Sequence, residues 1–215
     1  GIEFSVNAGL IAKKDMRLDL TANITHNINQ VTKLSQVDDP NSPGILVGGI
    51  SGGIGNNIQV QRVGNPTYSF LVYEQKYDAN GKMIESGAFK DPNHPDYNND
   101  GVINAQDKWS DLDAFVDRNG DGVINIKDRY IYGQAAPKVF AALALNFQYK
   151  KWYAGFSMRT ELGGHIYNNI HSNTATFQSV NGTQGYINNI SSLYYEDQIQ
   201  KVTTTQLLSD HYMEK

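Results

Sequence analysis

The 215 residues allow one large domain or two small ones, and they suffice to bury a sizeable hydrophobic core. A formal net charge of -4 and the lack of a long Lys/Arg run argue against a nucleic-acid partner. With no cysteine, the chain has neither a disulfide framework nor a thiolate metal site. The 13 Tyr and 20 Gly, with abundant Asn, Thr and Ser, favour a β-rich fold.

The first predicted element is a β-hairpin made of residues 2–12 and 16–25, joined by a short polar turn. In both strands apolar side chains fill every second position, which is the period that a pleated strand imposes. The apolar set of the first strand is Ile2, Phe4, Val6, Ala8, Leu10 and Ala12. That of the second is Met16, Leu18, Leu20, Ala22 and Ile24. Because the sequence begins inside a strand without a signal peptide, we expect either a mature protein that lacks its start or a piece of a longer protein.

We predict that residues 28–137 form one long connection between two hairpins, which we call the excursion. The glycine-rich stretch "GILVGGISGGIG" at 44–55 lacks the Gly-Lys-Ser/Thr of a phosphate loop, so we predict a flexible loop there. The run "YSFLVYEQKYD" at 68–78 is apolar enough for a strand but lacks a clean apolar face. We expect its aromatic residues to pack within the loop, the alternative being that Tyr68, Phe70, Tyr73 and Tyr77 line a lumen.

An acidic twelve-residue motif occurs twice in this excursion. "DYNNDGVINAQD" at 96–107 returns as "DRNGDGVINIKD" at 117–128, with an offset of 21 residues at every matching position. Residues 91–128 hold nine Asp and only three basic residues, so this segment carries a charge of -6. Unless a cation compensates them, the carboxylates of each copy would repel one another.

Both copies match the calcium loop that places oxygen ligands at positions 1, 3, 5, 7, 9 and 12 around a glycine at position 6. The predicted ligands of the first copy are Asp96, Asn98, Asp100, the carbonyl of Val102, Asn104 and Asp107. Those of the second are Asp117, Asn119, Asp121, the carbonyl of Val123, Asn125 and Asp128. We predict Ca²⁺, with Mg²⁺ as the alternative ion; a pair of merely polar Asx turns is the competing interpretation. Asp at position 12 is shorter than the usual Glu, which predicts weaker bidentate coordination and a lower cation affinity.

These loops are not paired EF-hands, because the two prolines of "KDPNHP" prevent a helix from entering the first copy. Only "QDKWSDLDAFVD", between the copies, can form a short helix. We therefore expect structural cation sites that hold in place a long loop with little core of its own.

A second β-hairpin is predicted at 139–149 and 152–161, again with strict alternation and a short turn at Lys150-Lys151. The alternating pattern fits a soluble antiparallel sandwich with one wet face, and it fits a transmembrane barrel with lipid outside and a polar lumen inside. Strands of ten or eleven residues and charges restricted to one face favour the barrel. Short joins in such barrels are periplasmic turns and long joins are extracellular loops.

The resulting interpretation is an all-β chain of antiparallel strands from an incomplete transmembrane β-barrel. Residues 1–27 and 138–162 form barrel hairpins, 28–137 an extracellular loop with both metal loops, and 163–215 a second extracellular loop in which the chain stops. About four to six strands are expected, too few to close a pore.

Three segments, taken in order, resemble the C-terminal half of the barrel in SusC/RagA-type TonB-dependent outer-membrane transporters of Bacteroidetes. They are "RVGNPTYSF", "DRNGDGVINIKDRYIYGQAAPKVFAAL" and "SMRTELGGHIYN". The resemblance covers nearly the whole chain. It rests in particular on Asp128-Arg129, Gly133 and Pro137-Lys138, which follow the metal loop as they do in that family. The chain departs from the family in lacking a plug domain, a TonB-contacting segment and a closing strand, and in having two acidic loops.

The resemblance implies an outer-membrane protein that imports oligosaccharides or peptides. It also implies a SusD-like lipoprotein partner, contact with outer-membrane lipid, and energy from TonB through an N-terminal region that this chain lacks. An enzyme is not expected, since the five His form no His-Glu-x-x-His pair and no nucleophile elbow occurs. Single scattered His are expected to be packing or surface residues. The alternative function is a secreted calcium-dependent adhesion module with dockerin-like loops, although a dockerin needs a helix after each loop.

Overall fold

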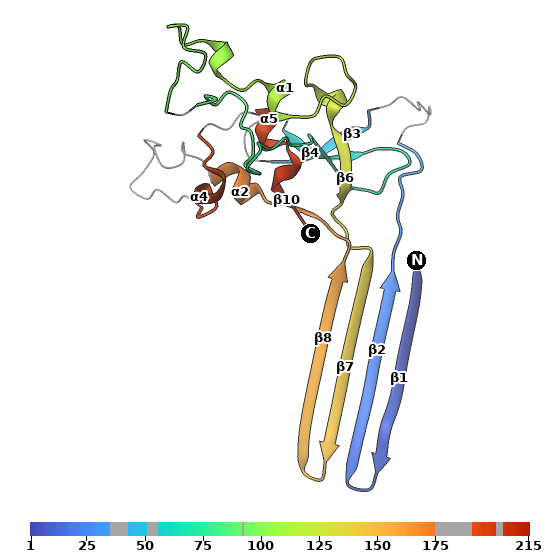
Figure 1. Ribbon diagram of the computed structural model, residues 1–215. Helices are drawn as coiled ribbons and strands as arrows, with labels where there is room; N and C mark the ends of the chain where they lie inside the picture. The colour runs from blue at the N-terminus through green and yellow to red at the C-terminus, as the bar shows by residue number, and fades with distance from the viewer. Residues whose placement is uncertain (35–42, 51–55, 92, 175–190, 201–203) are drawn as a thin grey trace.

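The computed structural model describes residues 1–34, 43–50, 56–91, 93–174, 191–200 and 204–215, and antiparallel β-sheets dominate it (Figure 1). The largest is a four-stranded sheet in the order β1-β2-β7-β8, which we call the tall sheet. Its strands are β1 (Ile2–Lys13), β2 (Met16–His26), β7 (Val139–Tyr149) and β8 (Trp152–Leu162). The two predicted hairpins therefore lie side by side, and the prediction of a mainly β, antiparallel fold is confirmed.

The strand register lines up the apolar residues of all four strands across the tall sheet. In one row Leu20 pairs with Ala8 and Leu145, and Leu145 pairs with Phe156. Because successive side chains of a strand point to opposite faces, every second row belongs to the same face. The sheet therefore has one continuous apolar face.

The intervening rows form a polar face. One of them joins Asn7, Thr21, Ala144 and Ser157. Two ion pairs within single strands lie on this face, with Arg17 Nε 2.7 Å from Asp19 and Arg159 Nη2 3.4 Å from Glu161. The charged residues of the four strands thus lie on this side of the sheet, except Lys13, which pairs with Met16 next to the turn.

A register shift in β1 corrects one detail of the predicted alternation. Between Gly9 and Ile11 the pairing advances by one residue, so Ile11 lies opposite Leu18 in an apolar row. Ala12 lies opposite Arg17 in a polar row, and its predicted place on the apolar face is wrong. A β-bulge of this kind inserts one extra residue into a strand and reverses the faces beyond it.

A smaller antiparallel sheet lies within the long excursion, in the order β3-β4-β5-β6. Its strands are β3 (Ile45–Gly49), β4 (Asn57–Gln61), β5 (Ser69–Val72) and β6 (Tyr130–Gln134). The prediction of a flexible loop at 44–55 is therefore wrong for β3, while residues 51–55 lie outside the described part of the chain. The remaining pair of strands is β9 (Ile166–Tyr167) with β10 (Met213–Glu214).

The described residues of 27–138 and 163–215 form the second part of the molecule, which we call the head. Besides the two smaller sheets, the head contains short helices. They are η1 (Ala105–Asp107), α1 (Asp111–Ala114), η2 (Ile126–Asp128), α2 (Asn169–Thr174), α4 (Tyr194–Asp197), α5 (Thr204–Leu207) and η3 (Asp210–Tyr212). None of these helices is long and apolar enough to cross a bilayer.

The hydrophobic core belongs to the head. Buried residues from both long connections meet there, including Phe70, Val72, Phe115, Leu208 and Tyr212. The expectation that the excursion has little core of its own is therefore wrong: β5 is buried along its whole length, and the end of the chain packs onto it.

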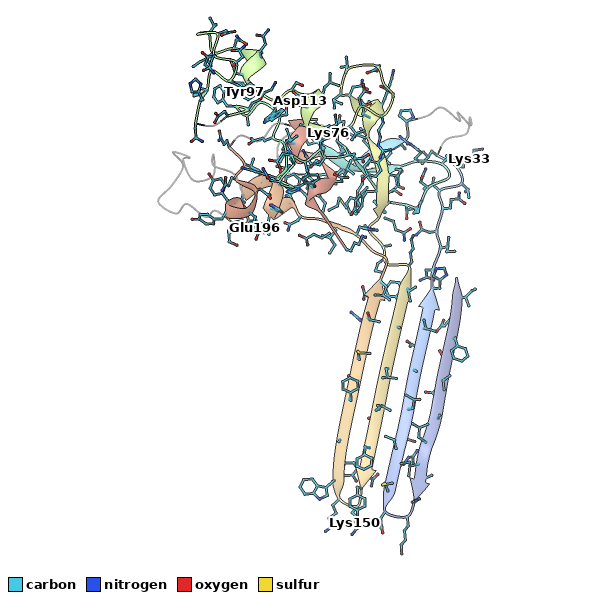
Figure 2. All side chains as sticks on the ribbon, viewed as in Figure 1. Lys33, Lys76, Tyr97, Asp113, Lys150 and Glu196 are labelled. Atoms are coloured by element: carbon cyan, nitrogen blue, oxygen red, sulfur yellow. The ribbon has the colours of Figure 1, made fainter. Side chains whose placement is uncertain are left out.

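Figure 1 shows the tall sheet extending away from the head, with the turns β1–β2 and β7–β8 at the far end. Figure 2 places Lys150 at that far tip and Lys76 and Asp113 in the head. Both long connections, 27–138 and 163–215, leave the tall sheet at the head end.

Candidate functional site

The two acidic loops share one hydrogen-bond pattern, which begins at position 1. Asp96 Oδ2 accepts the N–H of Gly101 at 2.8 Å, and Asp117 Oδ2 accepts that of Gly122 at 2.8 Å. The carboxylate at position 1 thus bends the chain around itself at the glycine of position 6. Because both copies form this bond, the repeat in the sequence is also a repeat in three dimensions.

The carboxylate at position 12 closes each loop. Asp107 is fully buried; its Oδ2 accepts the N–H of Asn104 at 2.8 Å and its Oδ1 that of Tyr97 at 3.0 Å. The hydrogen bond from the Asn104 backbone, supported by those from Asn98 and Tyr97, lowers the pKa of Asp107. A carboxylate that accepts several N–H bonds stays ionised and keeps lone pairs for a cation.

The second copy closes in the same way. Asp128 is fully buried, and it accepts the N–H of Asn125 at 2.7 Å and that of Arg118 at 3.0 Å. Asn125 Oδ1 in turn caps η2 by accepting the N–H of Lys127 at 2.9 Å. The short Asp at position 12 thus reaches its own loop because a 3-10 turn draws it inward.

The acceptors at positions 5 and 7 face the side-chain amides of positions 3 and 9. In the first copy Asn98 Nδ2 donates to Asp100 at 3.0 Å, and Asn104 Nδ2 donates to the Val102 carbonyl at 3.0 Å. In the second copy the same bonds are 2.8 Å, from Asn119 to Asp121, and 3.0 Å, from Asn125 to Val123. Each of these acceptors is thus paired with an amide N–H group, a contact that a bound cation would replace.

Each loop offers three carboxylates, two amide oxygens and one carbonyl, and this donor set fits a hard divalent cation. Around Ca²⁺, with bonds of about 2.3–2.6 Å, any two ligand atoms lie within about 5 Å of each other. In neither loop, both of which are fully described, do the three carboxylates meet within 4.8 Å. The residues fit a cation in kind and order, and binding would draw the carboxylates closer together.

The structure also describes the four aromatic residues of the 68–78 run. Phe70 and Tyr73 are buried in the core of the head, whereas Tyr68 and Tyr77 are about half exposed. The expected packing role therefore holds for Phe70 and Tyr73.

Three further side chains, which no sequence motif connects, meet in the head. The ligand atoms of His171, Asp197 and His211 all lie within 4.8 Å of one another. The three residues come from three separate short helices and follow no motif spacing, so sequence reasoning treated both His as isolated. They meet only because the described segments 166–174, 191–200 and 204–215 pack together in the tertiary fold.

Comparison with known proteins gives two findings. Over 175 residues, or 81% of its length, the chain is 36% identical to the TonB-dependent receptor SusC of Bacteroides thetaiotaomicron. Its structure matches the RagAB peptide transporter with a TM-score of 0.59 over 99% of the chain at 14% sequence identity. No family model matches the chain.

The chain spans 15% of the length of SusC and 21% of the matched RagAB chain. The sequence match and the shared fold confirm the SusC/RagA-like character that the three motif segments predict, and with it the outer-membrane location.

Proposed function

We propose that this chain forms part of the wall and of the external loops of an outer-membrane nutrient transporter. The observation that carries the proposal is the uncovered apolar face of the tall sheet. On this face Ile2 is 74% exposed and Phe156 is 55% exposed. Exposing an apolar face of this size to water would cost free energy. Lipid is the solvent in which such a face is stable.

The dimensions of the sheet support a bilayer crossing. Strands β2 and β7 have 11 residues each, which at about 3.3 Å per residue gives a length of about 36 Å. A tilt of about 45° reduces this to a height of about 26 Å, close to the ~25 Å apolar band of outer-membrane barrels. The opposite, polar face is suited to a water-filled lumen.

The positions of the connections support an orientation. The two-residue turns lie at one end of the tall sheet and the whole head lies at the other. Since such barrels have short periplasmic turns and long extracellular loops, the head would stand outside the cell. Trp152 and Tyr149, paired at the turn, would lie in the periplasmic interface, where aromatic residues are enriched.

Substrate and partners follow from the relatives. SusC is named a TonB-dependent receptor and RagAB a peptide transporter, neither of them an enzyme. For this chain we propose TonB-driven import of oligosaccharides or peptides, together with a SusD-like lipoprotein.

Uptake by the source bacterium tests this function. A strain lacking the protein and the same strain complemented with it would be given radiolabelled oligosaccharide and oligopeptide mixtures. We expect one mixture to be taken up only by the complemented strain, and a protonophore to abolish that uptake because TonB needs the inner-membrane proton gradient. Equal uptake of both mixtures with and without the protein would contradict the proposal.

We further propose that residues 96–107 and 117–128 bind Ca²⁺, or Mg²⁺, as structural cations. Two observations support this proposal. The two loops share one hydrogen-bond pattern, and the carboxylate at position 12 is buried in both. Because the head has its own core, the cations would order the loop tips without being needed to fold the head.

Calorimetric titration of the chelator-treated protein with CaCl₂ measures these sites. The double substitution Asp117→Asn/Asp121→Asn should remove one bound Ca²⁺ per chain. Asp91→Asn, which changes a carboxylate outside both loops, should remove none. Unchanged stoichiometry in the double variant would rule out the second loop.

The dockerin-like adhesion module finds no support. A dockerin loop is followed by a helix, whereas each loop here ends in a single 3-10 turn, η1 or η2, and then continues as extended backbone at Lys108 or Arg129.

A further inference from the structure

We propose that His171, Asp197 and His211 form a binding site for a divalent first-row transition metal, with Zn²⁺ as the best-suited ion. Two imidazoles and one carboxylate are a ligand set that leaves a fourth position for water or another ligand. The site lies apart from the calcium-type loops, and the proposal stands or falls independently of the transport function.

The three ligand atoms already have nearly the spacing that a metal requires. Asp197 Oδ2 contacts the Nε2 atoms of both His171 and His211, the second at 3.0 Å. Zinc bonds of about 2.0–2.1 Å in a tetrahedron would place ligand atoms about 3.3 Å apart. A cation entering between them would replace the Nε2 protons and widen the cluster only slightly.

Hydrogen bonds hold the His-bearing segments before any metal enters. The backbone N–H of His171 donates to Asn168 Oδ1 at 2.8 Å. Next to His211, Asp210 accepts the N–H of Gln75 at 2.9 Å and the hydroxyl of Tyr130 at 2.6 Å. The two segments that carry the imidazoles are thus held in place, which reduces the entropy that binding would cost.

The ring of Tyr212 packs against both imidazoles. Its centroid lies 5.2 Å from that of His171 and 5.0 Å from that of His211, in edge-to-face contact with both. Tyr212 is itself buried, so the two rings have little freedom to turn away from Asp197.

Tyr77 provides the outer contact that metal-binding imidazoles usually have. Its hydroxyl lies 3.1 Å from His211 Nδ1. When a metal takes the place of the Nε2 proton, the proton of the neutral imidazole would lie on Nδ1 and would be donated to this oxygen. Burial, with smaller contributions from Asp210 and Asp197, raises the pKa of Tyr77 to about 12, so the phenol remains neutral at pH 7.

The surroundings of the cluster suit an ion that must be partly desolvated and yet must enter. The side chains of His171, Asp197 and His211 are 12%, 11% and 15% exposed. Asp197 also lines a cleft of about 210 Å³, which reaches the cluster from the side of this carboxylate.

The ligand types separate this site from the two loops. Imidazole nitrogen suits Zn²⁺ and its neighbours, whereas the all-oxygen loops suit Ca²⁺ or Mg²⁺. The competing interpretation is a hydrogen-bonded His–Asp–His cluster that never binds metal. Both interpretations predict a folded apo protein, so the discriminating measurement is metal binding itself.

The test uses the full-length protein in detergent, stripped of metal and titrated with Zn²⁺ and separately with Co²⁺. The test variant is His171→Gln/His211→Gln, because a Gln amide can keep the hydrogen bond to Asp197 but is a poor metal ligand. The matched control is His94→Gln, which changes an exposed His outside the cluster.

We expect the wild type and His94→Gln to bind one more Zn²⁺ per chain than the double variant, and to give the visible absorption of tetrahedral Co²⁺ that the double variant lacks. Tyr77→Phe should weaken Zn²⁺ binding roughly tenfold, as loss of an outer contact does. Equal Zn²⁺ stoichiometry in wild type and double variant would overturn the proposal. So would a wild-type Co²⁺ spectrum without tetrahedral bands, a result that does not depend on whether the variant folds.

Discussion

Asn99 and Gly120 occupy the same place, position 4, in the two acidic loops. Both have a positive φ, 55° for Asn99 and 71° for Gly120, in the left-handed region that Asn and Gly tolerate best. Gly101 and Gly122, at position 6, have φ values of 83° and 79°. The two copies thus differ in sequence at position 4 without differing in the backbone that each loop needs.

Gly122→Ala should therefore destabilise the second loop although its side chain would meet no atom. A Cβ added there has nothing within 4 Å, so the cost of about 1–2 kcal/mol arises from the left-handed backbone alone. Amide hydrogen exchange of residues 117–128 should become roughly 5- to 30-fold faster. Gly49→Ala is the matched control, since that position is equally open and lacks a positive φ. Equal effects of the two substitutions would refute the backbone explanation.

Helix α1, the single turn between the loops, depends on a reciprocal cap. The N–H and the hydroxyl of Ser110 both donate to Asp113 Oδ2 at 2.8 Å, and the N–H of Asp113 donates to Ser110 Oγ at 3.2 Å. The hydrogen bond from the Ser110 backbone is the main cause that lowers the pKa of Asp113. One turn has little helical stability of its own, so the cap largely defines it.

This cap should make α1 sensitive to acid. A carboxyl group whose pKa is lowered by folding stabilises the fold above its unfolded pKa of about 3.9, and that stabilisation is lost as the pH falls through the folded pKa. Asp113→Asn should therefore speed amide exchange of residues 110–116 at pH 7, after correction for intrinsic rates. The difference from wild type should vanish once the pH falls below the folded pKa of Asp113. A difference that persists unchanged at low pH would show that the charge of Asp113 is not what matters.

The tall sheet assigns opposite environments to neighbouring residues of one strand. On β7, Leu145 lies in the apolar row with Leu20 and Phe156, and Ala144 lies in the polar row with Thr21 and Ser157. Both residues are near the middle of the strand and so would lie near the bilayer midplane.

Leu145→Arg should cost about 2–4 kcal/mol of folding free energy, the penalty for a lipid-facing Arg at that depth. The adjacent Ala144→Arg should cost much less, because its side chain would enter the lumen. The proportion of heat-modifiable, folded protein in outer-membrane fractions on gels measures both. Similar losses for the two variants would mean that the faces are not lipid and lumen.

At the scale of the molecule, the tall strands were predictable because alternation over eleven residues is a strong local signal. The bulge between Gly9 and Ile11 was not, because its one sign in the sequence, the successive apolar residues Leu10 and Ile11, does not by itself identify a bulge. The sheet of the head escaped prediction because β5 is buried on both faces and so shows no period of two. The loops were found by their fixed spacing, whereas His171, Asp197 and His211 meet only through the tertiary fold.

The central claim is that one face of the tall sheet contacts lipid, and the absence of native Cys in this chain allows a direct measurement. Single Cys residues at positions 143, 144, 145 and 146 would carry a fluorophore in protein reconstituted into bilayers. Lipids with nitroxide-labelled acyl chains should quench positions 143 and 145, while aqueous iodide should quench 144 and 146. If iodide quenched all four positions, or if the lipids quenched none, the sheet would not be a barrel wall.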